Sequence, residues 1–126
     1  MCDKELILDI LENIECSLQE ITEWMKDIKT IDDFVCTQHG TLLRNGVCMK
    51  ILAIGEELKS IDKRTKKQLL KKYPVVDWTK VMGMRDIIAH HYFEVDAEIV
   101  FNAAVMYVPQ MSTCIKQIKK DVSTKL

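Results

Sequence analysis

The sequence predicts an all-α fold, an antiparallel bundle of four long helical segments plus a short helix, in a single domain over residues 1–126. Apolar residues recur at spacings of three and four along most of the chain, as they do on the buried face of a helix. No segment of the sequence alternates apolar and polar residues over the length of a strand. A chain of 126 residues also most simply forms one domain around one core.

The first two long helices are predicted from these spacings. Apolar residues between positions 6 and 28 mark one face of a helix of about seven turns. A second helical stretch is expected after the capping residues Thr30 and Asp33, and it runs to about Ser60. His39-Gly40 is expected to bend or break this stretch, because glycine costs a helix interior about 1 kcal/mol relative to alanine.

The remaining helices are predicted from capping residues and prolines. The basic segment 62–72 is expected to form the short helix, which Pro74 prevents from continuing. Asp77 is expected to cap the next helix, and Val95-Asp96 indicates a loop followed by a new cap. A last helix is then expected from about Ala97 to Lys120, with a bend at Pro109.

Composition argues against several classes of protein. No apolar run approaches the roughly 20 residues needed to span a bilayer, and acidic residues interrupt the apolar N-terminus, so neither a membrane span nor a secretory signal is expected. We therefore expect a cytoplasmic protein with no membrane partner. The five cysteines are odd in number and contain no Cys-x-x-Cys pair, so neither a disulfide framework nor a zinc site is expected. Most of the five cysteines are expected to be buried among apolar residues: Cys2, Cys16, Cys36, Cys48 and Cys114. No cofactor or metal site is expected.

Charge is distributed unevenly although the net charge is only −1. The first third of the chain is acidic, whereas residues 59–72 are strongly basic. Such a run can be a solvated helix face, or it can attract phosphates and so guide an RNA backbone. The candidate RNA-binding residues are Lys59, Lys63, Arg64, Lys66, Lys67, Lys71 and Lys72.

The segment "RDIIAHHYFEVD", residues 85–96, carries the candidate site. Residues seven apart on an ideal helix lie within about 20° of one another, so Arg85 and Tyr92 would share a face. His90 would point elsewhere unless the helix loosens in its last turn. A plainer interpretation is a helix end, because a histidine there is favoured by the macrodipole and Arg85 could pair with Asp86 or Glu94.

These side chains suit cleavage of an RNA phosphodiester without a metal. Histidine can move protons near neutral pH, and arginine can hold two phosphate oxygens with a permanently charged planar fork. One histidine and one arginine are few for this reaction. Two chains related by a two-fold axis would supply an acid, a base and two phosphate clamps, so the chemistry favours a homodimer.

Arg85, His90 and Tyr92 stand as Arg-x-x-x-x-His-x-Tyr within "KKYPVVDWTKVMGMRDIIAHHYFEVDAEIV", with "IGEELK" upstream. Tyr-Pro, Asp-Trp, Gly-Met-Arg-Asp and Ala-His-x-Tyr at these spacings resemble the HepT-like branch of the HEPN superfamily over roughly residues 51–101. The resemblance implies an all-helical, HEPN-like homodimer with a composite active site at its interface. It also implies a metal-independent endoribonuclease that is the toxin of a toxin-antitoxin pair. Position 91, a variable position of the motif, is a second histidine here.

Residue by residue, the resemblance implies that Arg85 and His90 are catalytic. It implies that Tyr92 is the target of AMP transfer by a small nucleotidyltransferase antitoxin, the expected cognate partner. Two other functions stay open, a non-catalytic helical interaction module and a nucleotide-binding partner subunit of a nucleotidyltransferase. The complete motif favours the ribonuclease over both.

Overall fold

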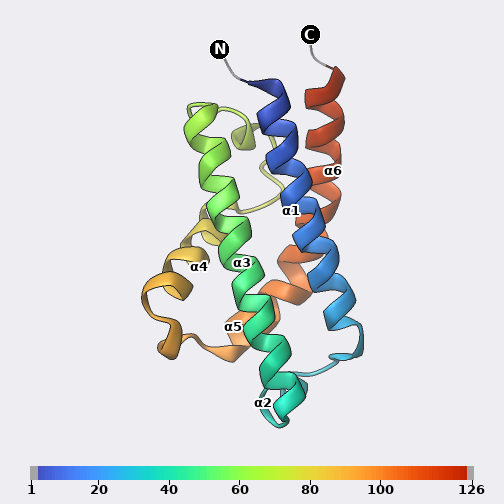
Figure 1. The fold of residues 1–126 in the computed structure, drawn as a ribbon, viewed down its shortest axis with the longest axis vertical. Coiled ribbons are helices and arrows are strands. Elements are labelled where there is room, and N and C mark those ends of the chain that lie inside the picture. The colour runs from blue at the N-terminus through green and yellow to red at the C-terminus, as the bar shows by residue number, and fades with distance from the viewer. Residues whose placement is uncertain (1–2, 125–126) are drawn as a thin grey trace.

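The computed structural model describes residues 3–124, which form a bundle of helices without a strand in that range (Figure 1). Helix α1 (Lys4–Trp24) packs against both α3 (Gln38–Arg64) and α6 (Val108–Thr124), and α4 (Trp78–His90) packs against α3. The two ends of the described chain lie at the same end of the bundle (Figure 1). The all-α prediction is confirmed, with differences in where individual helices break.

Helix α1 buries the face that the apolar spacing marks. Its buried residues are all isoleucine or leucine: Ile7, Ile10, Leu11, Ile14, Leu18 and Ile21. Asp3 caps its first turn, since the carboxylate accepts from the backbone N–H of Leu6 at 3.2 Å. After Trp24 the predicted helix tightens into one 3-10 turn, Met25–Asp27, and Ile28 is extended. The first helix is therefore confirmed, but it ends about one turn early.

The break in the second helical stretch lies before His39-Gly40 rather than at it. A short helix, α2 (Asp32–Val35), ends ahead of Thr37, whose hydroxyl accepts from the Gly40 N–H at 2.8 Å and caps α3. Gly40 is buried, and a Cβ there would lie 1.8 Å from the backbone oxygen of Asp33. The glycine thus lets the first turn of α3 approach α2 closely, and it does not bend a helix interior.

The short helix expected over residues 62–72 is not formed. Helix α3 ends at Arg64 in a left-handed turn, with φ of 54° at Lys66 and 61° at Lys67. The Lys67 N–H donates to the Asp62 carbonyl at 2.7 Å, which satisfies a carbonyl at the helix end. Two successive left-handed residues cannot continue an α-helix, so only one 3-10 turn, Leu70–Lys72, follows.

The last two predicted caps are confirmed. Asp77 accepts from the Lys80 N–H at 3.1 Å and starts α4, and Asp96 accepts from the Glu98 N–H at 2.9 Å and starts α5 (Ala97–Asn102). The chain passes from α5 into α6 through a π-helical turn, residues 103–107. Pro109 lacks an N–H and its ring crowds the carbonyl four residues before it, which explains the widened turn. The irregularity expected at Pro109 therefore appears immediately before it.

The four described cysteines divide evenly between core and surface. Cys48 and Cys114 lie in the core, whereas Cys16 on α1 and Cys36 immediately after α2 are exposed. Cys2 lies outside the described residues. None of the described helices is long and apolar enough to cross a membrane.

Candidate active site

Arg85 lies where α4 packs closely against a glycine of α3. Gly55 of α3 is buried, and a Cβ there would lie 2.3 Å from Cβ and 2.9 Å from Cγ of Arg85. Carbon atoms in ordinary contact are about 3.5–4.0 Å apart, so only glycine allows this approach. The position of Arg85 is therefore set by helix packing as well as by charge.

The guanidinium of Arg85 is held by carboxylates on both helices. Its Nη1 donates to Asp86 Oδ1 at 3.1 Å, and its Nε meets Glu56 Oε1 in an ion pair that lacks the alignment of a hydrogen bond. Asp86 also accepts from Lys59 Nζ at 2.5 Å. Hydrogen bonds from Lys59 and Arg85 hold the pKa of the Asp86 carboxyl below its usual value. Two carboxylates and a lysine thus fix a guanidinium whose side chain is only 22% exposed.

The pairing of Arg85 with Asp86 is the contact that the plainer interpretation expects. Glu94, the other carboxylate considered, lies next to His91 instead, with 3.8 Å between Glu94 Oε1 and His91 Nδ1. Arg85 Nη2 has no hydrogen-bond partner within residues 3–124. The structural ion pairs therefore leave the two N–H groups of Nη2 available to a phosphate.

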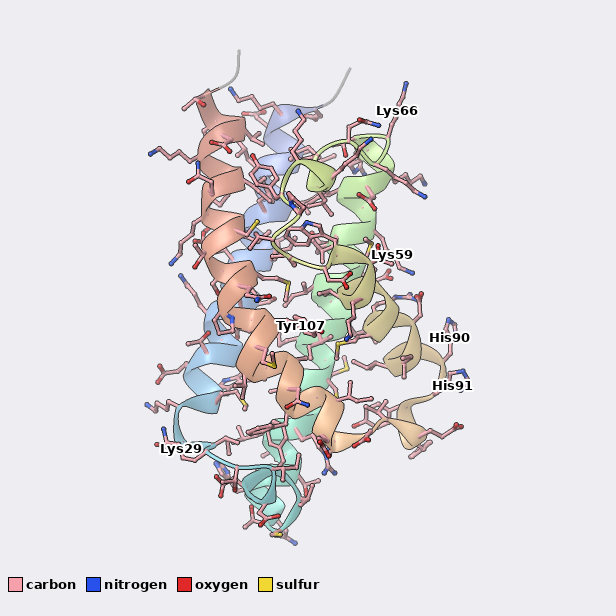
Figure 2. The ribbon with its side chains drawn as sticks, turned by 180° about the vertical axis from the view of Figure 1, so that it is seen from behind. Lys29, Lys59, Lys66, His90, His91 and Tyr107 are labelled. Carbon is pink, nitrogen blue, oxygen red and sulfur yellow. The ribbon has the colours of Figure 1, made fainter. Side chains whose placement is uncertain are left out.

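His90 is the last residue of α4, and its side chain is exposed. Figure 2 shows His90 and His91 at the outer edge of the molecule, pointing away from the bundle. Within the described part of the chain, no hydrogen bond or ion pair involves His90. Its imidazole is therefore free to meet a substrate or a second subunit.

Tyr92 lies beyond the end of α4, in a 3-10 turn (Tyr92–Glu94), with 41% of its surface exposed. Its hydroxyl donates to Asn45 Oδ1 on α3. The helix stays regular through His90 and changes direction at His91, so the loosening expected before His90 occurs after it. Arg85 and Tyr92 consequently do not share a face of one continuous helix.

The three motif residues do not contact one another within one chain. No hydrogen bond, ion pair or ring contact among residues 3–124 joins any two of them. Arg85 and Tyr92 reach α3 at Glu56 and Asn45, which are roughly 16 Å apart along the helix axis. One chain thus fixes Arg85 and Tyr92 separately and leaves His90 exposed.

The basic run extends from α3 over the turn that follows it. Lys59 is paired with Asp86, and Arg64 Nε donates to Ser60 Oγ at 3.2 Å. Outside Lys59 the side chains of the run are exposed: Lys63, Arg64, Lys66, Lys67, Lys71 and Lys72. Lys66, Lys59 and the two histidines lie along the same edge of the molecule in Figure 2. This arrangement is compatible with an extended anion that reaches the end of α4.

Three neighbours of the motif were not predicted as site residues. Gly55 and Glu56 stand in the "IGEELK" segment, where a glycine inside an otherwise apolar helical pattern is the available signal of a close helix contact. Asn45 gives no such signal, because its contact with Tyr92 spans 47 positions of sequence.

Comparison with known proteins covers most of the chain. The family model described as "Ribonuclease HepT-like" matches residues 14–118. A protein of Methanocaldococcus jannaschii named "Putative RNase MJ0127" is 29% identical over 119 residues, which are 94% of this chain and 88% of that protein. "Probable ribonuclease HepT" of Thermococcus cleftensis is 26% identical over 112 residues, 89% of this chain and 94% of that protein. No solved structure matches the chain significantly.

The family match extends well beyond the motif from which the resemblance was inferred. It begins within α1 and ends within α6, so it includes every helix that positions Arg85, His90 and Tyr92. The chain belongs to the HepT-like ribonuclease family.

Proposed function

We propose that this chain is a metal-independent endoribonuclease, the toxin of a type II toxin-antitoxin pair, and that it cuts RNA at a site shared by two subunits. The observation that carries the proposal is that α4 holds Arg85 in fixed ion pairs and ends at His90, which is exposed and without a hydrogen-bond partner among the described residues. The family match supports a ribonuclease.

The reaction needs two proton transfers and a cation that stabilises the negative charge on the phosphate oxygens. The 2′-oxygen attacks phosphorus as one histidine takes its proton, and the bond from phosphorus to the 5′-oxygen breaks as a second histidine protonates that oxygen. The products are a 2′,3′-cyclic phosphate and a free 5′-hydroxyl. Arg85 would hold the non-bridging oxygens, where negative charge develops in the transition state. None of these steps needs a metal ion.

The number of groups favours a homodimer. The motif supplies one histidine per chain, His90, and the adjacent His91 lies next to Glu94, whereas the reaction uses both an acid and a base. Because His90 ends its helix and points away from its own bundle, a two-fold axis near the end of α4 would bring two such histidines together (Figure 2).

Tyr92 is the proposed point of control. Its hydroxyl would attack the α-phosphorus of ATP on a small nucleotidyltransferase antitoxin, which removes the phenol proton while pyrophosphate leaves. For this step the hydroxyl must leave Asn45, and Tyr92 as a residue is exposed enough for a partner enzyme to approach it. The attached AMP adds negative charge and bulk beside the site, which excludes RNA.

An RNA-cleavage assay with a chelator present tests the proposal. We expect His90→Ala to lose about 10²–10⁴ in rate, the usual contribution of a general acid or base, and Arg85→Ala to lose most cleavage. His39→Ala is the matched control, because His39 is also exposed but lies in the first turn of α3. Cleavage by a folded His90→Ala protein at the wild-type rate, or loss of wild-type cleavage on chelation, would contradict the proposal.

A further inference from the structure

A cavity of about 230 Å³ opens beside Tyr92, between α3 and the segment that leads into α5. Arg44, Asn45 and Cys48 of α3 form one wall, and Tyr92 and Phe93 form another. The rest of the lining is apolar, and none of the lining residues is acidic. The cavity is smaller than the roughly 300–1,000 Å³ of drug-sized sites and is open to solvent, so it suits a ligand of which only part is enclosed.

Phe93 provides an aromatic surface with nothing covering it. Its side chain is 100% exposed, although the adjacent Tyr92 ring meets it edge-on, with 5.8 Å between centroids and 74° between planes. A fully exposed phenylalanine gains nothing from burial in this chain. Stacking of a nucleic-acid base on such a ring is worth about 1–3 kcal/mol, and every base offers a face for it.

Arg44 supplies a positive charge to the same cavity. It is half-buried, and it has no hydrogen bond or ion pair among the residues that the structure describes. Its guanidinium acts on the neighbouring Cys48 thiol, where it partly offsets the rise in pKa that burial causes. An arginine in this setting, with no carboxylate in the lining, favours a phosphate as its partner.

Asn45 adds hydrogen-bonding groups to the same cavity. Its Oδ1 accepts from the Tyr92 hydroxyl, which leaves the two N–H groups of its side-chain amide to donate. Base edges and sugar hydroxyls offer acceptors for such donors. The cavity therefore combines a stacking surface, an amide and a cation within one small volume.

We propose that this cavity binds one nucleoside 5′-monophosphate unit, with its base on Phe93 and its phosphate at Arg44. The inference rests on the proposed function, which supplies two possible sources of that unit. The unit is either a nucleotide of the bound RNA or the AMP attached to Tyr92, and both present a base, a ribose and a phosphate.

Titration of the isotopically labelled, unmodified protein with AMP, followed by NMR, tests the cavity itself. We expect shifts in residues 44–48 and 92–100, weaker binding of adenosine, and a dissociation constant raised at least about five-fold in Phe93→Ala. Arg44→Gln should remove the preference for AMP over adenosine. Val75→Ala, another exposed apolar residue, and Lys116→Gln, an exposed cation on α6, are the matched controls. Shifts that avoid these segments, or binding unchanged in both cavity variants, would overturn the proposal.

Two further measurements distinguish the sources. If the RNA supplies the unit, Phe93→Ala raises KM for RNA at least about five-fold and leaves kcat close to that of Val75→Ala. If the AMP on Tyr92 supplies the unit, Phe93→Ala leaves KM for RNA unchanged. The AMP-modified protein then shows NMR shifts in the cavity residues, and Phe93→Ala removes those shifts. AMP titration requires neither cleavage nor an antitoxin, so AMP binding by an inactive protein would refute only the proposed function. Cleavage without any AMP binding at the cavity would refute only this inference.

Discussion

Gly55→Ala tests the close packing that places Arg85. The new Cβ would lie 2.3 Å from Arg85 Cβ, so α3 and α4 must separate by about 1.2 Å to reach the shortest ordinary carbon contact. Overpacking costs about 1–3 kcal/mol, and the upper part of that range, about 2–3 kcal/mol, applies here because the neighbouring Cβ is attached directly to a helix backbone, which cannot swing aside. Alanine returns about 1 kcal/mol of helix propensity. We expect a net loss of about 1–2 kcal/mol in the free energy of unfolding.

Urea denaturation followed by circular dichroism measures this loss. With a slope of about 2 kcal/mol per molar urea, the midpoint should fall by about 0.5–1 M. Gly83→Ala on α4 is the matched control, since no atom lies within 4 Å of a Cβ built there. That variant should gain about 0.5–1 kcal/mol, because it improves helix propensity without a clash.

Cleavage kinetics extend the same test to function. A displacement of about 1 Å at a catalytic group can cost about 10²-fold in rate, so Gly55→Ala should lose activity well beyond its loss of stability. Gly83→Ala should keep wild-type cleavage. A Gly55→Ala protein that unfolds at or above the wild-type urea midpoint would refute the close approach of α3 and α4, and with it the packing explanation for Arg85.

The remaining predictions concern assembly, RNA placement and control. Mixing Arg85→Ala chains with His90→Ala chains should change cleavage relative to either variant alone if the site is composite, because a mixed dimer keeps one Arg85 and one His90. Sedimentation as a monomer at micromolar concentration would contradict this. The double variant Lys63→Glu, Lys67→Glu should reduce the slope of log binding constant for RNA against log salt concentration by at least about 1.4, since each phosphate contact with a single strand contributes about 0.7. An unchanged slope would assign the run to a solvated face. Co-expression with a cognate nucleotidyltransferase should add one or more AMP units to the wild type but none to Tyr92→Phe, which should stay active. If intact-mass spectrometry finds no mass increase of AMP size in the wild type, control at this residue is refuted.

The parts of the fold that the sequence predicts are those encoded by local physical rules. Helix α1 is marked by its apolar spacing, and Asp77 and Asp96 begin helices because a carboxylate after a break caps the next turn. The sequence misplaces the break near Gly40, because this glycine permits a close approach and does not break the helix. A Cβ at Gly40 would meet the backbone oxygen of Asp33, seven residues earlier, and the apolar spacing does not indicate that contact.

The same distinction applies to the basic segment. Lysines are good helix formers, and the composition of residues 62–72 therefore favours a helix. The structure instead places Lys66 and Lys67 in the left-handed region, where an L-residue loses about 1–2 kcal/mol. Burial of Leu70 after this turn offers a compensating gain that propensity alone does not include.

For the site, motif spacing identifies the residues but not the contacts that hold them. Arg85 is bound by Glu56 and by Asp86, which also binds Lys59. The contacts of Glu56 with Arg85 and of Lys59 with Asp86 join α3 to α4, between residues 27 or more positions apart in sequence. Tyr92 is held by Asn45 in the same way. Such contacts depend on how two helices cross, which a pattern along one helix does not specify.

The two catalytic candidates differ in what their own chain provides. Arg85 sits in the middle of the α3–α4 contact, where a glycine, two carboxylates and a lysine fix its position before any substrate arrives. His90 has no such support, because α4 ends at that residue and no described residue bonds to its ring. Electrostatic stabilisation depends on groups that are preorganised, whereas proton transfer requires the imidazole to lie within about 3 Å of the reacting oxygen. A single chain meets the first requirement and not the second, so the orientation of His90 must come from what packs against the end of α4, either the RNA or a second subunit.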